Sequence, residues 1–185
     1  MKKFFLTSGK ISLETPIEIS SAIELSNLAN DESIAKTIGS RAFPYPYTRE
    51  DAKIFIEKNR EDNGKSFIID WFISFENQKV GIIGLSNIDY DNRSAHVGYW
   101  INSQFRGRGI ATAALELVVE YSMNTLHLHR LYTNVMHNNP SSMRVLLKCG
   151  FSIEGIEKES LFLDGKYYDM IKFGIIFRNH ALRSN

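Results

Sequence analysis

The sequence has few of the residues that stabilise or anchor secreted and membrane-bound proteins. Cys149 is the one cysteine among 185 residues, which excludes an internal disulfide and fits a reducing compartment. Near the N-terminus, the apolar run from Phe4 to Leu6 is too short for a secretory signal or a membrane anchor. We therefore expect a cytoplasmic protein that does not bind a membrane.

A charge bias is also lacking. The 22 basic and 21 acidic residues leave a formal net charge of +1, so no global field would recruit nucleic acid or an anionic membrane. With 43% hydrophobic residues the chain can bury a core of ordinary size, and no repeat, linker or low-complexity segment divides it. We predict one domain that spans residues 1–185.

Metal-ligand and nucleophile patterns are missing as well. His127, His129 and His137 have no carboxylate or cysteine beside them in a recognised ligand spacing, and a histidine is favoured at a helix end in any case. Cys149 ends an apolar helical segment, where a free cysteine is typically a packing residue. We predict no metal and no cysteine nucleophile.

Alternating and helical periodicities are present along most of the chain. Thr48-x-x-Asp51 resembles a capping box at a helix start, and Asp164-Gly165 is typical of a hairpin turn. The predicted strands span residues 11–15, 67–75, 80–88, 96–101, 130–136, 158–163 and 167–176. The predicted helical segments span residues 19–28, 31–38, 48–63, 110–123 and the stretch after Asn139 that stops at Gly150. This mixture predicts an α/β (α+β) fold with helices on both faces of one sheet.

The most informative stretch is a basic glycine loop, Gln104 to Gly109, between an aromatic strand and an apolar helix. The first amides of a helix lack intrahelical partners and point the same way, so such a turn can bind a phosphate. Gly107 and Gly109 permit positive φ and close approach of a ligand, while Arg106 and Arg108 add charge. The loop lacks both the Walker lysine and the third glycine of a dinucleotide fingerprint.

The loop instead reads Arg106-x-x-Gly109-x-Ala111, which resembles the Gln/Arg-x-x-Gly-x-Gly/Ala signature of the GNAT superfamily of N-acetyltransferases. Gly98-Tyr-Trp-Ile101 before it and Asn139-x-x-Ser142 after it are similar to the Rim-type branch, which acetylates N-terminal amines of ribosomal proteins. The resemblance extends from about residue 11 to residue 176. It implies a mostly antiparallel mixed sheet whose central strands splay apart to bind acetyl-CoA.

The resemblance also implies which residues bind acetyl-CoA. Backbone groups of Tyr99, Trp100 and Ile101 would bind the pantetheine arm, and one N–H would polarise the thioester carbonyl. Asn139 would contact the pantetheine amides, and Ser142 would lie near the sulfur. The pyrophosphate would lie on the amides of Arg106, Gly107, Arg108, Gly109, Ile110 and Ala111.

Two catalytic residues follow from departures from the family pattern. Rim-type relatives carry Glu two residues before Gly-Tyr-Trp, where this chain has His96, and a neutral imidazole is a competent base. Many GNAT enzymes place a tyrosine proton donor where this chain has Leu146, so Ser142 is the candidate donor to the leaving thiolate. The alternatives are that His96 is a surface strand residue and that Asn139 and Ser142 only cap a helix.

Three functions are compatible with these residues. The first is acetyl transfer to a primary amine, foremost the N-terminal amino group of a protein such as a ribosomal protein. The second is acetylation of a small amine, such as a polyamine, an amino acid or an aminoglycoside, and the third is a catalytically silent acetyl-CoA-binding module. We expect direct transfer by a monomer or homodimer, with the acceptor near the loop Phe43–Tyr47, the turn Asp89–Arg93 and the last strands.

Overall fold

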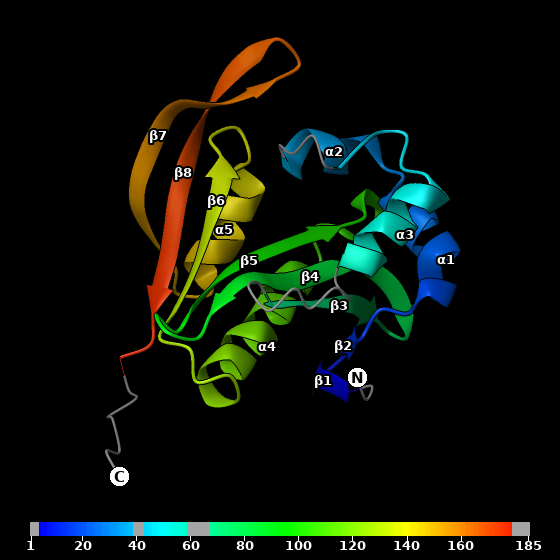
Figure 1. Cartoon of the computed structure of the whole chain (residues 1–185), viewed down its shortest axis with the longest axis horizontal. Coiled ribbons are helices and arrows are strands. Elements are labelled where there is room, and N and C mark those ends of the chain that lie inside the picture. The colour runs from blue at the N-terminus through cyan, green and yellow to red at the C-terminus, as the bar shows by residue number, and fades with distance from the viewer. Residues whose placement is uncertain (1–3, 39–42, 59–66, 179–185) are drawn as a thin grey trace.

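The computed structural model describes residues 4–38, 43–58 and 67–178, and these form a mixed α/β arrangement around one sheet (Figure 1). The strands are β1 Phe4–Ser8, β2 Ile11–Thr15, β3 Phe67–Phe75, β4 Gln78–Asp89, β5 Ser94–Ile101, β6 Arg130–Met136, β7 Ser152–Leu163 and β8 Lys166–Ile176. The helices are α1 Ala22–Ala29, α2 Glu32–Ile38, α3 Arg49–Lys58, α4 Ile110–Asn124 and α5 Pro140–Lys148. Two short 3₁₀ turns, η1 Ile19–Ser21 and η2 Ser103–Phe105, precede α1 and α4.

The sheet is mostly antiparallel, as predicted. Its strand order is β1-β2-β3-β4-β5-β6-β8-β7, and the one parallel pair among these described strands is β5 with β6. A parallel pair needs a crossover connection, which α4 provides. This places the turn between β5 and α4 at the centre of the sheet.

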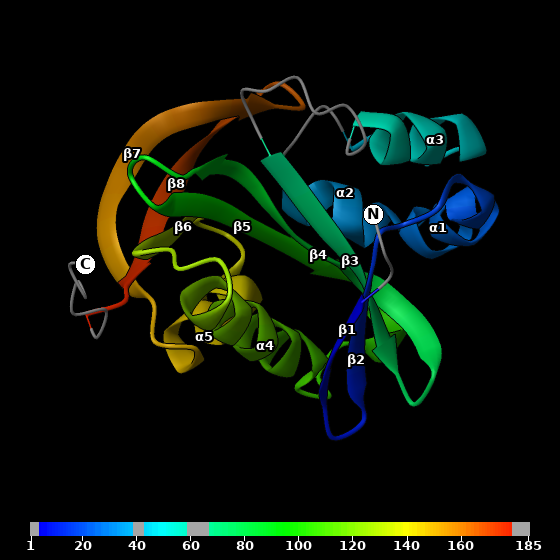
Figure 2. The same cartoon turned by 60° about the horizontal axis from the view of Figure 1, so that its bottom comes forward.

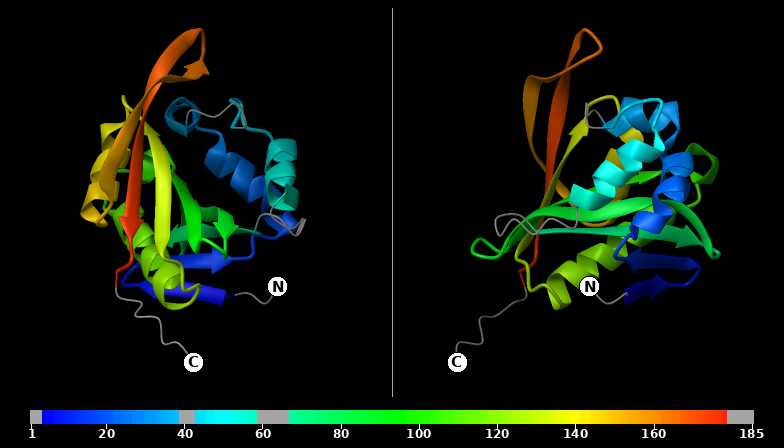
Figure 3. Two further views of the ribbon diagram at one scale, coloured as in Figure 1. Left: turned by 60° about the vertical axis from the view of Figure 1, so that its left-hand side comes forward. Right: turned by 45° about the vertical axis from the view of Figure 1, so that its right-hand side comes forward.

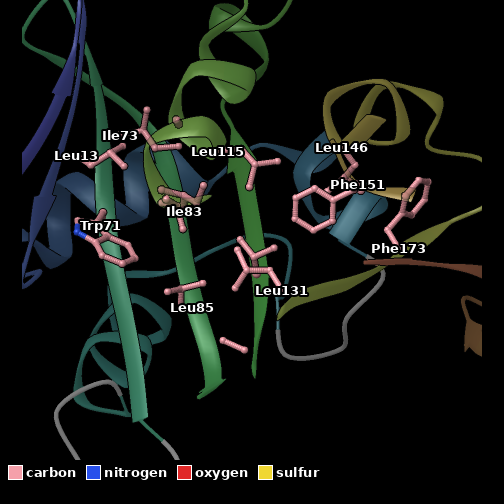
Figure 4. Packing of buried hydrophobic residues seen from close by; sticks show 14 of the residues in the cluster. Leu13, Trp71, Ile73, Ile83, Leu85, Leu115, Leu131, Leu146, Phe151 and Phe173 are labelled. Carbon is pink, nitrogen blue, oxygen red and sulfur yellow. The ribbon is translucent and has the colours of Figure 1, made fainter. Parts of the chain in front are cut away.

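Helices cover both faces of the sheet, which confirms the predicted layering. Helices α4 and α5 lie on one face and α1, α2 and α3 on the other (Figures 2 and 3). The larger core lies between the sheet and α4, where Trp71, Ile83, Leu115 and Leu131 are fully buried (Figure 4). A second core joins α1 and α3 to the opposite face of β3 and β4.

Local signals set two of the boundaries. The Thr48 backbone N–H donates to Asp51 Oδ2 at 2.8 Å, and the Asp51 N–H donates to Thr48 Oγ1 at 3.2 Å. This reciprocal pair is the predicted capping box at the start of α3. The Asp164–Gly165 turn likewise joins β7 to β8, with positive φ of 49° and 76° at its two residues. The predicted end of the third helix near residue 63 lies outside the described residues.

Both edges of the sheet differ from the prediction. Strand β1 was not expected, and β7 begins at Ser152 rather than at residue 158. An edge strand has one paired side and few inward residues, so its hydrophobic alternation is weak. In β1 only Phe4 and Leu6 pack against the core, and β7 shifts register between Glu157 and Leu161.

Candidate active site

The centre of the sheet opens where β5 and β6 diverge. The two strands pair over three residues, the last pair being His96 with Tyr132. Beyond it, residues 97–101 of β5 continue to pair with β4, while residues 133–136 of β6 pair with β8 (Figure 1). The backbone edge of Tyr99, Trp100 and Ile101 that faces away from β4 therefore lies on the side from which β6 has departed. This confirms the splayed central strands.

A tight turn connects the end of β5 to α4. The Asn102 side chain accepts a hydrogen bond from the Gln104 amide at 3.1 Å and donates one to the Leu28 carbonyl at 3.0 Å. Arg106 donates from Nε to the Ile101 carbonyl at 2.9 Å, and Arg108 lies over the Phe105 ring with its Cζ 5.6 Å from the centroid. Arg106 thus holds the end of β5 in place, a role the sequence did not indicate.

The two glycines of this turn adopt the conformation that the sequence predicted. Gly107 and Gly109 both have φ of 77°, in the left-handed region that favours glycine. A Cβ atom built on either would meet no described atom within 4 Å, so space is open above both residues. The Ala113 amide makes the first hydrogen bond of α4, to the Gly109 carbonyl, and the amides of Ile110 and Ala111 precede it. These amides can receive an anion.

The start of α5 faces β5 across the divergence. The Asn139 side chain is the N-cap, because its Oδ1 accepts from the Ser142 amide at 3.2 Å. The Ser142 hydroxyl instead lies 3.0 Å from the Tyr99 hydroxyl, which also donates to the Ser142 carbonyl at 3.3 Å. Asn139 therefore caps α5, while the Ser142 hydroxyl contacts Tyr99 instead of capping the helix. Sequence reasoning missed the Tyr99 side chain, since it considered only the Tyr99 backbone.

His96 lies at the apex of the divergence, between three strands. Its Nδ1 is 3.3 Å from the Ser86 hydroxyl on β4, and its Nε2 is 3.5 Å from the Thr133 hydroxyl on β6. The ring is also edge-on to Tyr132, with centroids 5.6 Å apart. Burial lowers the pKa of His96 below its usual 6.5, because the surroundings disfavour the charged imidazolium. The histidine is thus a partly buried, neutral group rather than a solvated surface residue.

The predicted acceptor elements lie beside β5, and in one of them the Asp89 carboxylate is already hydrogen-bonded within its own turn. In the loop after α2, the Phe43 ring is 4.8 Å from that of Tyr47 and 5.9 Å from that of Trp100, measured between centroids. In the turn after β4, Asp89 accepts hydrogen bonds from both the backbone and the side chain of Asn92, at 2.8 and 2.7 Å. Asp89 therefore closes its own turn.

Cys149 is half-buried at the end of α5, whereas the side chains of His127, His129 and His137 are exposed. Burial raises the pKa of the Cys149 thiol to about 11, and its Sγ donates to the Thr112 carbonyl at 3.6 Å. Within residues 4–38, 43–58 and 67–178, no three His, Cys, Asp or Glu side chains come together as metal ligands. None of the described helices has the length and apolar character needed to cross a lipid bilayer.

Comparison with known proteins agrees with this geometry. The acetyltransferase (GNAT) domain family matches residues 13–152. The "Putative ribosomal N-acetyltransferase YdaF" of Bacillus subtilis is 33% identical over 56% of this chain and 57% of its own length, so the match spans a little over half of that protein. The spermidine N(1)-acetyltransferase of Vibrio cholerae is 28% identical over 85% of this chain and 88% of its own.

A solved structure extends the comparison to a bound ligand. The microcin C7 self immunity acetyltransferase MccE, solved in complex with acetyl-CoA and AMP, superimposes with a TM-score of 0.79 at 28% identity. The superposition covers 92% of this chain and 94% of that one. The chain belongs to the acetyltransferase (GNAT) family, is similar to members of its Rim-type branch, and is an N-acetyltransferase that uses acetyl-CoA.

Proposed function

We propose that this protein acetylates a primary amine, foremost the N-terminal amino group of a protein such as a ribosomal protein. The observation that carries the transfer is the divergence of β5 and β6 after His96, beside the glycine turn that opens α4. The acceptor rests on similarity alone, because the 33% identical relative is named a ribosomal N-acetyltransferase.

The residues beside the divergence fit acetyl-CoA, which supplies an activated acetyl thioester. The backbone of Tyr99, Trp100 and Ile101 offers hydrogen-bonding groups to the pantetheine arm, on the strand edge that β6 leaves. The turn from Gly107 to Ala111 offers amides to the pyrophosphate, with open space above both glycines, and Arg106 and Arg108 add positive charge. The Arg106 amide, which the sequence analysis included among these donors, donates instead to the Ser103 carbonyl at 3.3 Å. Asn139 lies at the start of α5 on the other side of the same opening.

His96 is the proposed general base, either directly or through a water. Its lowered pKa keeps the imidazole neutral at neutral pH, the form that can take a proton from the acceptor ammonium. The Ser86 and Thr133 hydroxyls lie beside its two ring nitrogens and hold the ring between β4 and β6. Two neutral hydroxyl groups therefore orient the His96 ring, and neither of these contacts involves a charged partner.

Ser142 is the proposed donor to the leaving thiolate, and Tyr99 orients it. The Ser142 amide is bound by Asn139, so the hydroxyl is not needed as a cap. The 3.0 Å contact with Tyr99 fixes the Ser142 hydroxyl at the edge of β5. Cys149 has no part in the proposed transfer, since a thiol with a raised pKa stays protonated and is a poor nucleophile at neutral pH.

A small-amine acceptor is the second candidate. The Vibrio cholerae relative that matches 85% of this chain is named a spermidine acetyltransferase. The deciding experiment is an acceptor screen with acetyl-CoA that compares N-terminal peptides of ribosomal proteins with spermidine and an aminoglycoside. Amine-dependent release of free thiol with the peptides is the expected result. Release with spermidine alone would move the acceptor to the second candidate, and no release with any amine would indicate a silent acetyl-CoA-binding module.

A further inference from the structure

Residues 28–31, where α1 ends and α2 begins, are hydrogen-bonded to the segment that follows β5. We call these four residues the α1–α2 junction. The Leu28 carbonyl accepts from the Asn102 side chain at 3.0 Å, and Asp31 Oδ2 accepts from the Ser103 amide at 2.8 Å. Asn102 and Ser103 are the first two residues after β5. The junction therefore ties the helices on one face of the sheet to the segment that leads into the glycine turn.

The same junction also holds the loop that we expect beside the acceptor. Asn30 Oδ1 accepts from the Tyr47 amide at 3.1 Å. Tyr47 is buried, and its ring packs against that of Phe43, which in turn packs against Trp100 of β5. One part of the junction thus contacts the acceptor loop, while another contacts the segment before the glycine turn.

Asp31 has a particular place among the groups that fix this segment. The amides of residues 102–106 donate, in order, to the Val80 carbonyl, the Asp31 carboxylate, the Asn102 side chain, the Asn102 carbonyl and the Ser103 carbonyl. Among these five acceptors, only Asp31 belongs to the α1–α2 junction. The glycine turn that follows contains two residues with unusually free backbones, so a fixed start of the segment limits where its amides can lie.

The two oxygens of the Asp31 carboxylate bind different partners. Oδ1 accepts from the Ser33 amide at 3.0 Å and the Ser33 hydroxyl at 2.6 Å, which caps α2, while Oδ2 accepts from Ser103. Burial raises the pKa of Asp31, but the hydrogen bonds from Ser33 and Ser103 outweigh it and lower the pKa to about 2. The carboxylate is therefore ionised at neutral pH, and hydrogen bonds to a charged acceptor are stronger than neutral ones.

We propose that the α1–α2 junction positions both substrates, with Asp31 fixing the glycine turn for acetyl-CoA and Asn30 fixing the acceptor loop. This inference rests on the proposed acetyl transfer. Both are positioning residues, because they act through the amides of Ser103 and Tyr47. The sign of the effect identifies this role: a carboxylate near a polyanion repels it, so charge alone predicts tighter coenzyme A binding without Asp31, whereas positioning predicts weaker binding.

The test is calorimetric titration with coenzyme A, which needs no turnover. Asp31→Ser keeps a residue that can cap α2, but one hydroxyl oxygen cannot serve both the Ser33 and the Ser103 amides. We expect its Kd for coenzyme A to rise about tenfold, because a hydrogen bond to a charged group is lost. Asp31→Asn keeps the shape with one acceptor oxygen for the two amides, so it should weaken binding in the same direction.

The matched control is Asp51→Ser. Asp51 is also a carboxylate bound at the start of a helix, where it accepts from the Thr48 amide and hydroxyl, and its printed contacts lie within the capping box of α3. The variant should lose stability in a thermal melt and keep its Kd for coenzyme A. Unchanged or tighter binding in both Asp31 variants, or an equal loss in Asp51→Ser, would overturn the role of Asp31.

Asn30→Ala tests the other half of the junction. It should leave the Kd for coenzyme A unchanged and raise KM for whichever amine the acceptor screen identifies, because it releases the Tyr47 amide. An unchanged acceptor KM would overturn the role of Asn30. Absence of thiol release with every amine would overturn the proposed function and the role of Asn30 with it, whereas the titrations would still decide the role of Asp31.

Discussion

The hydroxyl of Tyr99 on β5 lies 3.0 Å from the hydroxyl of Ser142 on α5, and it also reaches the Ser142 carbonyl at 3.3 Å. This contact joins the central strand to the helix across the opening between β5 and β6. Burial raises the pKa of Tyr99 to about 12, so the phenol keeps its proton at neutral pH and acts as a donor. Tyr99 has a single hydroxyl proton, and either oxygen can be the donor in its contact with the Ser142 hydroxyl. When Tyr99 donates in that contact, the serine proton is available for another acceptor.

The first prediction concerns this pair. Ser142→Ala should lower kcat by about tenfold, roughly 1.4 kcal/mol of barrier, because thiolate is a fair leaving group and needs only modest help. KM for acetyl-CoA should change little, since the interaction strengthens only in the transition state. Steady-state kinetics measure both effects.

Tyr99→Phe is the matched variant, because it removes one hydroxyl and keeps the ring. If Tyr99 acts through Ser142, the double variant should be no slower than Ser142→Ala alone, whereas independent roles would make the two losses add. A thermal melt of each variant accompanies the kinetics. Normal turnover in a less stable Ser142→Ala protein would show that Ser142 has a structural role only.

The local parts of the site could be predicted from the sequence, and the long-range parts could not. The positive φ of Gly107 and Gly109 and the cap at Asn139 depend on a few consecutive residues, so their spacing is visible in the chain. The contact between Tyr99 and Ser142 depends on how far two strands diverge, which no spacing encodes. Asp31 shows both cases. Its cap of α2 is local, whereas its bond to the Ser103 amide joins residues 72 positions apart in the chain.

The family resemblance supplied what periodicity alone did not. Alternation predicts that residues 96–101 form a strand, but the splay after His96 came from the similarity of Gly98-Tyr-Trp-Ile101 to the GNAT pattern. Neither the hydrophobic alternation nor the family resemblance indicated strand β1, because the strand is short and precedes the region that matches the family. Element type was therefore predictable where one face is deeply buried, and the edges of the sheet were not.

The second prediction separates the two roles considered for Asn139. As the N-cap of α5 it satisfies the Ser142 amide, so Asn139→Ala should cost about 1 kcal/mol of unfolding free energy. Asn139→Asp keeps a capping oxygen but loses the amide donor, so it should retain stability and weaken only acetyl-CoA binding if the side chain contacts pantetheine. Denaturant melts and calorimetry on both variants make the comparison. Equal acetyl-CoA affinity in the parent and both variants would leave Asn139 as a cap alone.

The third prediction concerns pH and His96. The neutral imidazole is the active form, so kcat/KM should fall as the pH drops through the His96 pKa of the free enzyme. Burial lowers this pKa, which places the acidic limb of the profile below the ordinary value of 6.5. His96→Ala should remove that limb and reduce kcat by on the order of 10²-fold. A variant with the parent's rate and profile would transfer the role to an ordered water or another group.

The last prediction concerns the glycine that opens α4. Gly109 has φ of 77°, so any side chain there meets backbone strain even though the space above it is open. Asn and Asp tolerate this conformation best among the other residues and have nearly the same shape, which makes Gly109→Asn the control for Gly109→Asp.

Both variants should therefore lose a similar, small amount of stability in a thermal melt, and any larger difference between them must come from the charge. If the amides from Gly107 to Ala111 bind the pyrophosphate, the carboxylate of Gly109→Asp repels it and occupies its place at the start of the helix, where the amides would bind the carboxylate instead. Calorimetric titration with acetyl-CoA should show binding abolished in Gly109→Asp and only weakened in Gly109→Asn. Equal affinity in the two variants would mean that the pyrophosphate lies elsewhere.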